Sequence, residues 1–388
     1  MRKCWSFLST HGSKLAVVVM VVCLLTSCTS QRSPLEERAQ ALNRSSEDIK
    51  IGVAWPFETR NDFFREGLEM ALDEVNQQGI WDGTKIQLIQ KDDHNSVTEG
   101  MSIAQSFAED HSISAVIGHR SSTVTIPSSQ IYENAGLLLL APAATSPKLT
   151  SSNSPLIFRN IPDDSELGRS LALYSLENHF NNIAIYYTDD EYGRGLANAF
   201  EDKAKESGLK ITDRISGYKD LADLKRIADK WEALGTDLLV FAGIASDGIA
   251  VLGDLHKLNV TLPVIGGDGL DTETFAAAGK SIDGSVVASI YRPDGESEVN
   301  QAFREKFIQK YGVEPTKWAA QGYDCLHLLV DAIERAHSRL PVDIANQLHS
   351  QEAWTGTAGP RSFNSDGSTE QFPIVMKQVR NGTFQYID

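Results

Sequence analysis

Short apolar runs alternate with longer amphipathic stretches along most of this chain, and this alternation limits the folds that it can adopt. The run Leu137–Leu140 is apolar at every position, which is typical of a strand covered on both faces. The segment 62–77 instead places Phe64, Leu68 and Val75 on one helical face. Repetition of such strand and helix segments predicts an α/β protein built on parallel sheets.

The pattern runs through two cycles, which predicts two doubly wound parallel-sheet domains. We expect strands of the first cycle at 49–55, 86–90, 115–118 and 137–141. We expect strands of the second at 183–187, 210–216, 238–242, 263–266 and 286–290. Helices follow at 299–311, 318–337 and 342–348, and two final strands at 372–378 and 383–387.

These late helices lie far along the chain from the start of the second sheet, so we expect the chain to return to the first domain. The N-terminal lobe then comprises 48–163 and 291–358, and the C-terminal lobe comprises 164–290 and 359–388. The Asn381-Gly382 pair is well placed to turn the last two strands into a hairpin.

Residues 1–27 have the pattern of an export signal, with cations ahead of the apolar core Leu15–Leu25, which is short for a membrane span. The segment ends in Leu25-Thr26-Ser27-Cys28, which resembles the bacterial lipobox, where the signal peptide is cleaved before a cysteine that becomes lipidated. An uncleaved signal anchor with an incidental cysteine is the alternative. Residues 28–47 are polar, lack an apolar stripe wide enough for a core helix, and are expected to form a lipid-anchored tether.

The charge balance excludes some partners. The chain has 52 acidic and 36 basic residues and a formal net charge of −16, and removal of the signal would discard three of the cations. Such an acidic protein is unsuited to nucleic acid or to an anionic lipid surface.

The cysteines leave no intrachain disulfide in the mature domain. Of the four, Cys4 and Cys23 lie in the signal and Cys28 would be acylated, so only Cys325 remains. Its helical, apolar surroundings favour a buried structural thiol over a reactive one.

Two short stretches point to a ligand site. Residues 118–123 (GHRSST) follow the apolar run that ends at Ile117, and residues 141–145 (APAAT) follow the run that ends at Leu140. Each places hydroxyl groups and free backbone amides at the carboxyl end of a predicted parallel strand, where open α/β sheets bind ligands. This arrangement suits a small molecule with a carboxylate.

An enzymatic function has little support. The sequence has no nucleophile elbow, no His-Glu-x-x-His and no P-loop, and its nine histidines lack metal-ligand spacing. We therefore predict no catalytic residue, no metal site and no cofactor. His119, at a strand end, is expected to have a polar supporting role.

At several points the sequence resembles the type I periplasmic binding proteins of branched-chain amino acid ABC transporters, the leucine/isoleucine/valine-binding family. The matching motifs are IKIGVA from Ile49, VIGHxxS at 116–122, Pro127, IYE at 131–133, APAAT at 141–145, EYGRGLA at 191–197 and GPRSF at 359–363. The resemblance implies the fold of that family, with two hinged lobes that are joined by three crossovers and close on a ligand.

The resemblance also implies which residues bind the ligand. Ser122 and Thr145 match carboxylate- and ligand-binding positions, Asp268 falls where the family pairs an acidic residue with the ligand's ammonium, and further contacts are implied for Ala143, Ala144, Tyr192 and Trp318. Independently, hydroxyls and amides at a helix N-terminus favour a carboxylate. In the alternative interpretation Ser122 is only an N-cap, Thr145 a turn residue and Asp268 a loop charge.

The sequence departs from the family at positions that affect specificity. The cysteine pair of the type protein is absent, and Arg120 replaces an aliphatic pocket residue. A pocket edged by Arg120, Arg60, Trp55 and Trp318 would prefer a polar, acidic or aromatic side chain over leucine. Alternatively, either arginine points to solvent.

We therefore expect an exported lipoprotein on the periplasmic or cell-surface face of a bacterial membrane. It would capture an amino acid or related small polar ligand between its lobes and deliver it to a membrane permease. The alternative is a lipid-anchored ligand sensor or envelope regulatory protein with the same fold.

Overall fold

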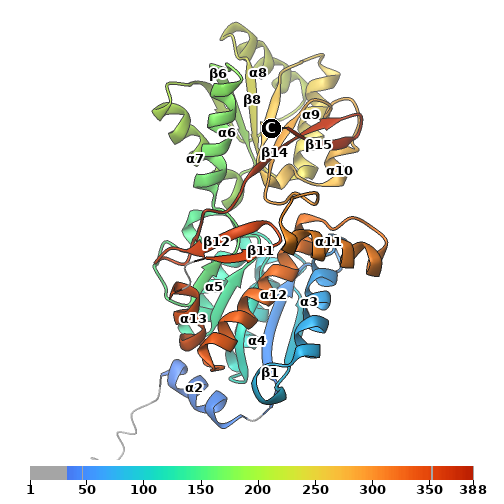
Figure 1. Cartoon of the computed structure of the whole chain (residues 1–388). Coiled ribbons are helices and arrows are strands. Elements are labelled where there is room, and N and C mark those ends of the chain that lie inside the picture. The colour runs from blue at the N-terminus through green and yellow to red at the C-terminus, as the bar shows by residue number, and fades with distance from the viewer. Residues whose placement is uncertain (1–32, 46, 351–352, 388) are drawn as a thin grey trace, which may run out of the picture.

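The chain forms two α/β lobes, one above the other in Figure 1. The computed structural model describes residues 33–387 apart from 46, 351 and 352. The predicted signal peptide and Cys28 lie outside these residues. The chain passes between the lobes after β5, after β10 and before β14, so the expected fold with three crossovers is confirmed.

A five-stranded sheet forms the centre of the N-terminal lobe. Its strands, all parallel, lie in the order β2 (Ile86–Asp92), β1 (Ile49–Trp55), β3 (Ile113–Gly118), β4 (Leu138–Ala141) and β5 (Ile157–Arg159). The edge strand β5 was not expected from the sequence.

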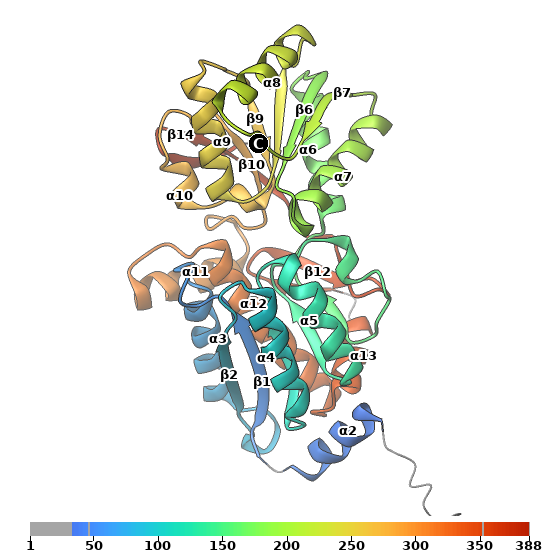
Figure 2. The same ribbon diagram turned by 180° about the vertical axis from the view of Figure 1, so that it is seen from behind.

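Helices cover both faces of this sheet (Figures 1 and 2). One face carries α3 (Phe64–Gln78), α11 (Glu298–Tyr311), α12 (Lys317–Ala336) and α13 (Pro341–Ser350), and the other carries α4 (Val97–Glu109) and α5 (Ser122–Asn134). In β4, Leu138 and Leu140 join the first core and Leu139 joins the second. Alternate residues of the strand are thus buried on opposite faces, which explains why every position is apolar.

The C-terminal lobe is built on a seven-stranded sheet. Its order is β15 (Thr383–Ile387), β14 (Val375–Arg380), β10 (Val286–Ser289), β9 (Val264–Gly266), β8 (Leu238–Ala242), β6 (Asn182–Tyr187) and β7 (Lys210–Ile215). One face is covered by α6 (Asp164–Glu177) and α7 (Glu191–Glu206), and the other by α8 (Leu221–Ala233), α9 (Ala245–Lys257) and α10 (Glu273–Ala276). The hairpin of β14 and β15 is antiparallel, and Asn381 and Gly382 turn it with φ of 53° and 83°.

The segment 359–372, which the sequence assigns to the C-terminal lobe, packs with the N-terminal lobe instead. There β12 (Gly359–Phe363) joins β11 (Trp354–Gly356) and β13 (Thr369–Glu370) in a small sheet. Phe363 and Phe372 are buried in the N-terminal core, and the backbone N–H of Arg159 donates to the carbonyl of Gly367. The final crossover therefore follows Phe372, because these aromatic side chains find their apolar partners in the first lobe.

The expected tether contains a folded helix, α2 (Pro34–Arg44), at the end of the N-terminal lobe farthest from the other lobe (Figure 1). Ser33 and Glu36 form a capping box at its start. Arg38 is fully buried, and its guanidinium donates to the carbonyls of Ala108, Asp110, Ile113 and Ala135. The absence of a wide apolar stripe was misleading because this helix is attached by a buried arginine together with Leu42, which is also buried.

The thiol of Cys325 is fully buried, as expected, and burial raises its pKa to about 12.

Within residues 33–387, as far as they are described, no helix combines the length and the apolar character of a membrane span.

Candidate functional site

The hydroxyl-rich stretches meet where the N-terminal lobe faces the C-terminal lobe, at the carboxyl ends of β3 and β4. Ser122 is the first residue of α5, is 2% exposed, and accepts a hydrogen bond of 3.2 Å from the backbone N–H of Ser146. The N-cap is Ser121, whose side chain accepts no backbone hydrogen bond. Ser122 is thus not the N-cap, and the start of α5 has no side-chain cap, which is the arrangement that binds an anion.

A buried carboxylate that the sequence analysis missed lies next to Thr145. Asp164 begins α6, and its backbone N–H donates to the carbonyl of Thr145 over 2.9 Å. Its side chain is fully buried, yet neither carboxylate oxygen accepts a hydrogen bond from a described residue. The Thr145 hydroxyl, also buried, lies close enough to this carboxylate to lower its pKa, although no hydrogen bond between the two has good geometry. The Asp163-Asp164 pair in the sequence could have indicated this acid, but two acidic residues at that point look like an ordinary helix start.

Burial raises the pKa of Asp164 well above its ordinary value, and the nearby Thr145 hydroxyl opposes this only in part. Close packing places the carboxylate here. A Cβ on Gly195 of α7 would lie 2.2 Å from Oδ2 of Asp164, so only glycine lets α7 approach it. An unpaired buried carboxylate costs free energy in the protein alone, and a cationic ligand would offset that cost.

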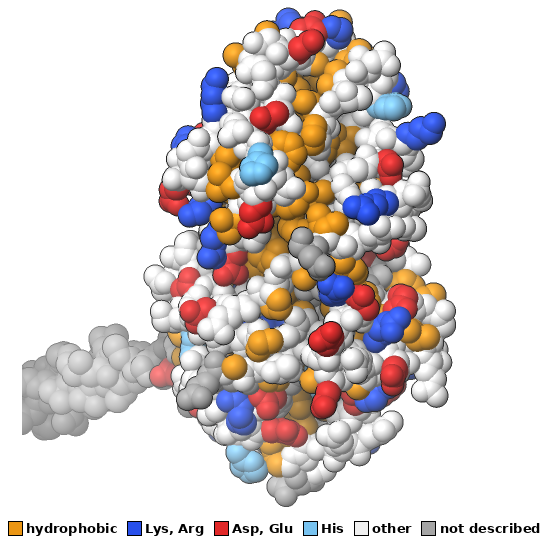
Figure 3. Space-filling model, turned by 45° about the horizontal axis from the view of Figure 1, so that its top comes forward, with side chains coloured by type: hydrophobic (Ala, Val, Ile, Leu, Met, Phe, Trp, Pro, Cys, Tyr) orange, Lys and Arg blue, Asp and Glu red, His pale blue; other side chains and the backbone are white. Residues whose placement is uncertain are grey.

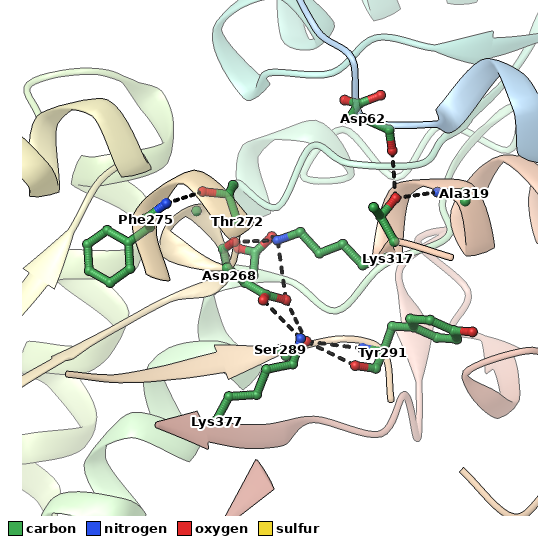
Figure 4. A network of polar contacts seen from close by, with 12 residues as sticks. Asp62, Asp268, Thr272, Phe275, Ser289, Tyr291, Lys317, Ala319 and Lys377 are labelled. Atoms are coloured by element: carbon green, nitrogen blue, oxygen red, sulfur yellow. Dashed lines mark hydrogen bonds and ion pairs between the residues drawn. The ribbon is translucent and has the colours of Figure 1, made fainter. Parts of the chain in front are cut away.

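The structure does not leave Asp268 free for a ligand, as the resemblance implied. Lys317, the first residue of α12 in the other lobe, donates to its backbone carbonyl and approaches Oδ2 at 3.4 Å. Both side chains are almost fully buried, at 4% and 5% exposure (Figure 4). The Tyr192 hydroxyl donates to Oδ1 of Asp268 over 3.2 Å and accepts from the backbone N–H of Gly269 over 2.9 Å.

Glycines on both sides of Asp268 make the contact with Tyr192 possible. A Cβ on Gly267 would lie 2.7 Å from the Tyr192 hydroxyl oxygen, and a Cβ on Gly269 would lie 2.7 Å from its ring. The motif at 266–269 is thus required by close packing against α7. Burial, followed by the charge of Asp268, raises the pKa of Tyr192 well above its ordinary value.

Arg120 is neither exposed nor unpaired. Its side chain is 15% exposed, and Nε lies 3.4 Å from Oδ2 of Asp62. Its guanidinium carbon is 5.0 Å from the ring centroid of Trp318 and 6.0 Å from that of Trp55. Burial lowers the pKa of Arg120, an effect that Asp62 opposes. The guanidinium is therefore not unpaired, because Asp62 faces it, whereas its predicted contact with a polar ligand stays a prediction.

Of the remaining predicted residues, three are buried in the packing around the site and one is exposed. Trp55 is fully buried and stacks on Phe64 with ring centroids 3.8 Å apart. Ala143 and Ala144 are also buried, and the carbonyl of Ala144 accepts a hydrogen bond of 3.2 Å from Arg159. Arg60, by contrast, is exposed.

The two lobes contact each other at the rim as well as at Lys317. Lys148, in the loop after β4, donates to Glu191 at the start of α7 over 2.8 Å. On the face that Figure 3 shows, cationic and anionic side chains are interspersed over both lobes.

His94 belongs to a second, more exposed group of ionisable side chains. Ligand atoms of Glu58, Asp92 and His94 all lie within 4.8 Å of one another. The hydrogen bond from Nδ1 of His94 to Glu99 raises the pKa of His94, which favours a charged imidazole.

The buried groups form a set that complements a zwitterion. The start of α5 with Ser122 offers amides and a hydroxyl for a carboxylate, and Asp164 with Thr145 offers acceptors for an ammonium group. The aromatic rings of Trp55 and Trp318 lie beside a neutralised Arg120. These groups are the candidate site, at the position between two domains where ligand sites commonly form.

The family model described as periplasmic binding protein matches residues 48–383, so the chain belongs to the periplasmic binding protein family. The Leu/Ile/Val-binding protein homolog 2 of Brucella abortus is 28% identical over 341 residues, which cover 86% of this chain and 91% of that protein. The leucine-, isoleucine-, valine-, threonine- and alanine-binding protein of Pseudomonas aeruginosa is 25% identical over 338 residues, covering 86% and 90%.

Similar solved structures agree with this family assignment. An ABC transporter substrate-binding protein of Desulfitobacterium hafniense, in complex with Leu, is 41% identical with a TM-score of 0.82, covering 88% of this chain and 100% of that chain. A leucine binding protein of Thermotoga maritima has a TM-score of 0.81 at 23% identity, which supports the fold. The resemblance to the leucine/isoleucine/valine-binding family is thereby confirmed.

Proposed function

We propose that this protein is the substrate-binding lipoprotein of an ABC transporter and that it captures an amino acid with an uncharged side chain between its lobes. The observation that carries the proposal is the fully buried Asp164 carboxylate, which forms no ion pair among the described residues and has the buried Thr145 hydroxyl beside it. A ligand ammonium group would satisfy both, because an ionised hydrogen bond in a water-excluded site is strong.

The ligand carboxylate would lie at the start of α5, where Ser122 and the first backbone amides are available. The side chain would extend toward Trp318. Because Asp62 neutralises Arg120 there, a charged side chain would find no unpaired partner at that end, which favours an aliphatic or aromatic one. The related Desulfitobacterium protein in complex with Leu makes leucine the first ligand to test.

Calorimetry on residues 33–388 tests the binding proposal with three compounds. Leucine should bind, while its methyl ester, which lacks the carboxylate, and 4-methylpentanoic acid, which lacks the ammonium group, should each bind about 30-fold more weakly or worse. Equal affinity for leucine and 4-methylpentanoic acid would exclude Asp164 as an ammonium site.

The anchor and the transport role need separate tests. Cys28→Ser in the full chain should abolish fractionation with membranes, whereas Cys325→Ser should not change it. Delivery to a permease predicts that deleting the gene lowers uptake of the bound amino acid. A strain with normal uptake and an altered signalling response would favour the sensor alternative.

A further inference from the structure

Lys317 is a buried cation that extends from one lobe to the carboxylates of the other. It begins α12, whose N-cap Thr316 donates its hydroxyl to the carbonyl of Asp62 over 2.6 Å, so the helix start is fixed to the N-terminal lobe. The ammonium group then reaches the Asp268 loop of the C-terminal lobe, as Figure 4 shows. It also lies 4.7 Å from the ring centroid of Trp318.

The second carboxylate of this cluster is also neutralised. Asp271 lies 3.9 Å from Lys317, but its closer partners are Lys377 at 2.9 Å and the hydroxyl of Ser289 at 2.6 Å. Both partners are in the C-terminal lobe. Asp268 therefore depends on Lys317 for its cation, whereas Asp271 does not.

The buried carboxylates between the lobes fall into two groups, those that pair with a cation of the chain and one that does not. Asp62 has Arg120, Asp268 has Lys317, and Asp271 has Lys377. Asp164 forms no ion pair among the described residues, and the Thr145 hydroxyl and the buried guanidinium of Arg159 offset its burial only in part. A ligand cation at Asp164 would leave the three ion pairs intact, whereas a second cation would compete with Lys317.

We propose that Lys317 is a specificity-determining residue whose ammonium group takes Asp268 out of ligand binding, so that the ligand's ammonium is held at Asp164 and diamino acids are rejected. This inference rests on the proposed function for its ligand class. It differs from the role that the family resemblance implies for Asp268. Lys317 acts as an ammonium group built into the chain, and it also ties the two lobes together.

A double-mutant cycle with leucine calorimetry separates the two roles. Asp268→Asn should weaken leucine binding by less than about tenfold, because Asp164 keeps the ligand ammonium. Lys317→Met should weaken it by about 30-fold or more, since it leaves Asp268 buried without its cation. The double variant should return to within about threefold of the unmodified protein. Loss of binding in Asp268→Asn and in the double variant alike would overturn the proposal.

Selectivity gives an independent readout. Lys317→Met should gain affinity for ornithine relative to leucine, because a second ligand cation can then pair with Asp268. The double variant Lys377→Met with Asp271→Asn is the matched control, since it removes a second buried lysine of the cluster together with the carboxylate that this lysine neutralises, and its preference for leucine should not change. An unchanged ornithine-to-leucine ratio in Lys317→Met would contradict the inference.

Failure of the proposed function can be distinguished from failure of the inference about Lys317. If the unmodified protein binds no amino acid, the proposed function is wrong. The ion pair can then be tested by thermal unfolding without ligand, where each single variant should lower the melting temperature and the double variant should recover most of the loss. Additive losses would show that Lys317 and Asp268 do not act as a pair. If Lys317→Met does not fold, the small effect expected for Asp268→Asn decides the question alone.

Discussion

The carboxylate of Asp164 lies directly against the backbone of Gly195, where a Cβ would be only 2.2 Å from Oδ2. This contact between the starts of α6 and α7 holds an unpaired, fully buried acid between the lobes. The position of the acid is thus decided by a glycine 31 residues away in the sequence.

Gly195→Ala should displace the Asp164 carboxylate and weaken leucine binding by about tenfold or more, as expected when a charged hydrogen bond loses its geometry. Calorimetry measures the affinity. Gly253→Ala is the matched control, because it also lies within a helix but a Cβ there meets nothing within 4 Å. That control should bind normally and be more stable by about 0.5–1 kcal/mol. Equal binding by both variants would place the ligand elsewhere.

Asp164→Asn should raise stability while reducing binding. Because burial raises the pKa of Asp164 in the folded protein, the ionised form destabilises the fold, and its removal should raise the melting temperature at pH 7 by roughly 2 °C or more. Leucine affinity should fall by about 30-fold or more. Thermal unfolding and calorimetry on one sample test both; a variant that binds normally would contradict the site.

The same pKa shift predicts how both quantities depend on pH. The folded state retains a proton that the unfolded chain loses, so the free energy of unfolding contributed by Asp164 decreases as pH rises from the ordinary aspartate value through the raised pKa. Ligand binding has the opposite trend, because an ammonium group needs the ionised carboxylate. Affinity should decrease between pH 7 and pH 5, and binding should release protons. Calorimetry in buffers of different ionisation enthalpy measures this release; identical heats in all of them would argue against Asp164.

Arg120→Leu should destabilise the protein rather than simply improve the binding of leucine. Its loss leaves Asp62 mostly buried without its cation, which costs about 3 kcal/mol. Replacing both residues, by Arg120→Leu and Asp62→Asn, should recover most of the stability. Chemical denaturation of the three variants tests this. Tighter leucine binding with unchanged stability in Arg120→Leu would instead support the original expectation of an unpaired guanidinium.

Arg38→Ala should release α2 from the N-terminal lobe. Four carbonyls lose their charged donor, so the docking of the helix should weaken by about 2 kcal/mol or more. Limited thermolysin digestion, which cuts before leucine and alanine, should then cleave within residues 34–44, while amino acid binding stays the same. Arg44→Ala, which removes an exposed arginine of the same helix, is the control and should remain protected.

The sequence by itself determined most of the fold. Strands β1 and β8 have the predicted bounds, because burial on both faces of a strand imposes a pattern that local composition shows. The same is true of the hydroxyl residues after β3 and β4, since parallel strands bring their carboxyl ends to one edge. Helix α2 and segment 359–372 were placed wrongly because a few buried side chains, which contact distant parts of the chain, attach them to the N-terminal lobe.

Only the tertiary structure decided which charges are free. The sequence shows Asp62, Asp164 and Asp268 as three similar acids, and the motif resemblance selected Asp268. Their partners Arg120 and Lys317 come from distant segments, and the ion pairs form only when the loops and lobes pack together. The free energy of a buried charge depends on its neighbours in space rather than on its neighbours in sequence. For that reason Asp164, flanked by ordinary helix-start residues, emerges as the unpaired acid only in the folded protein.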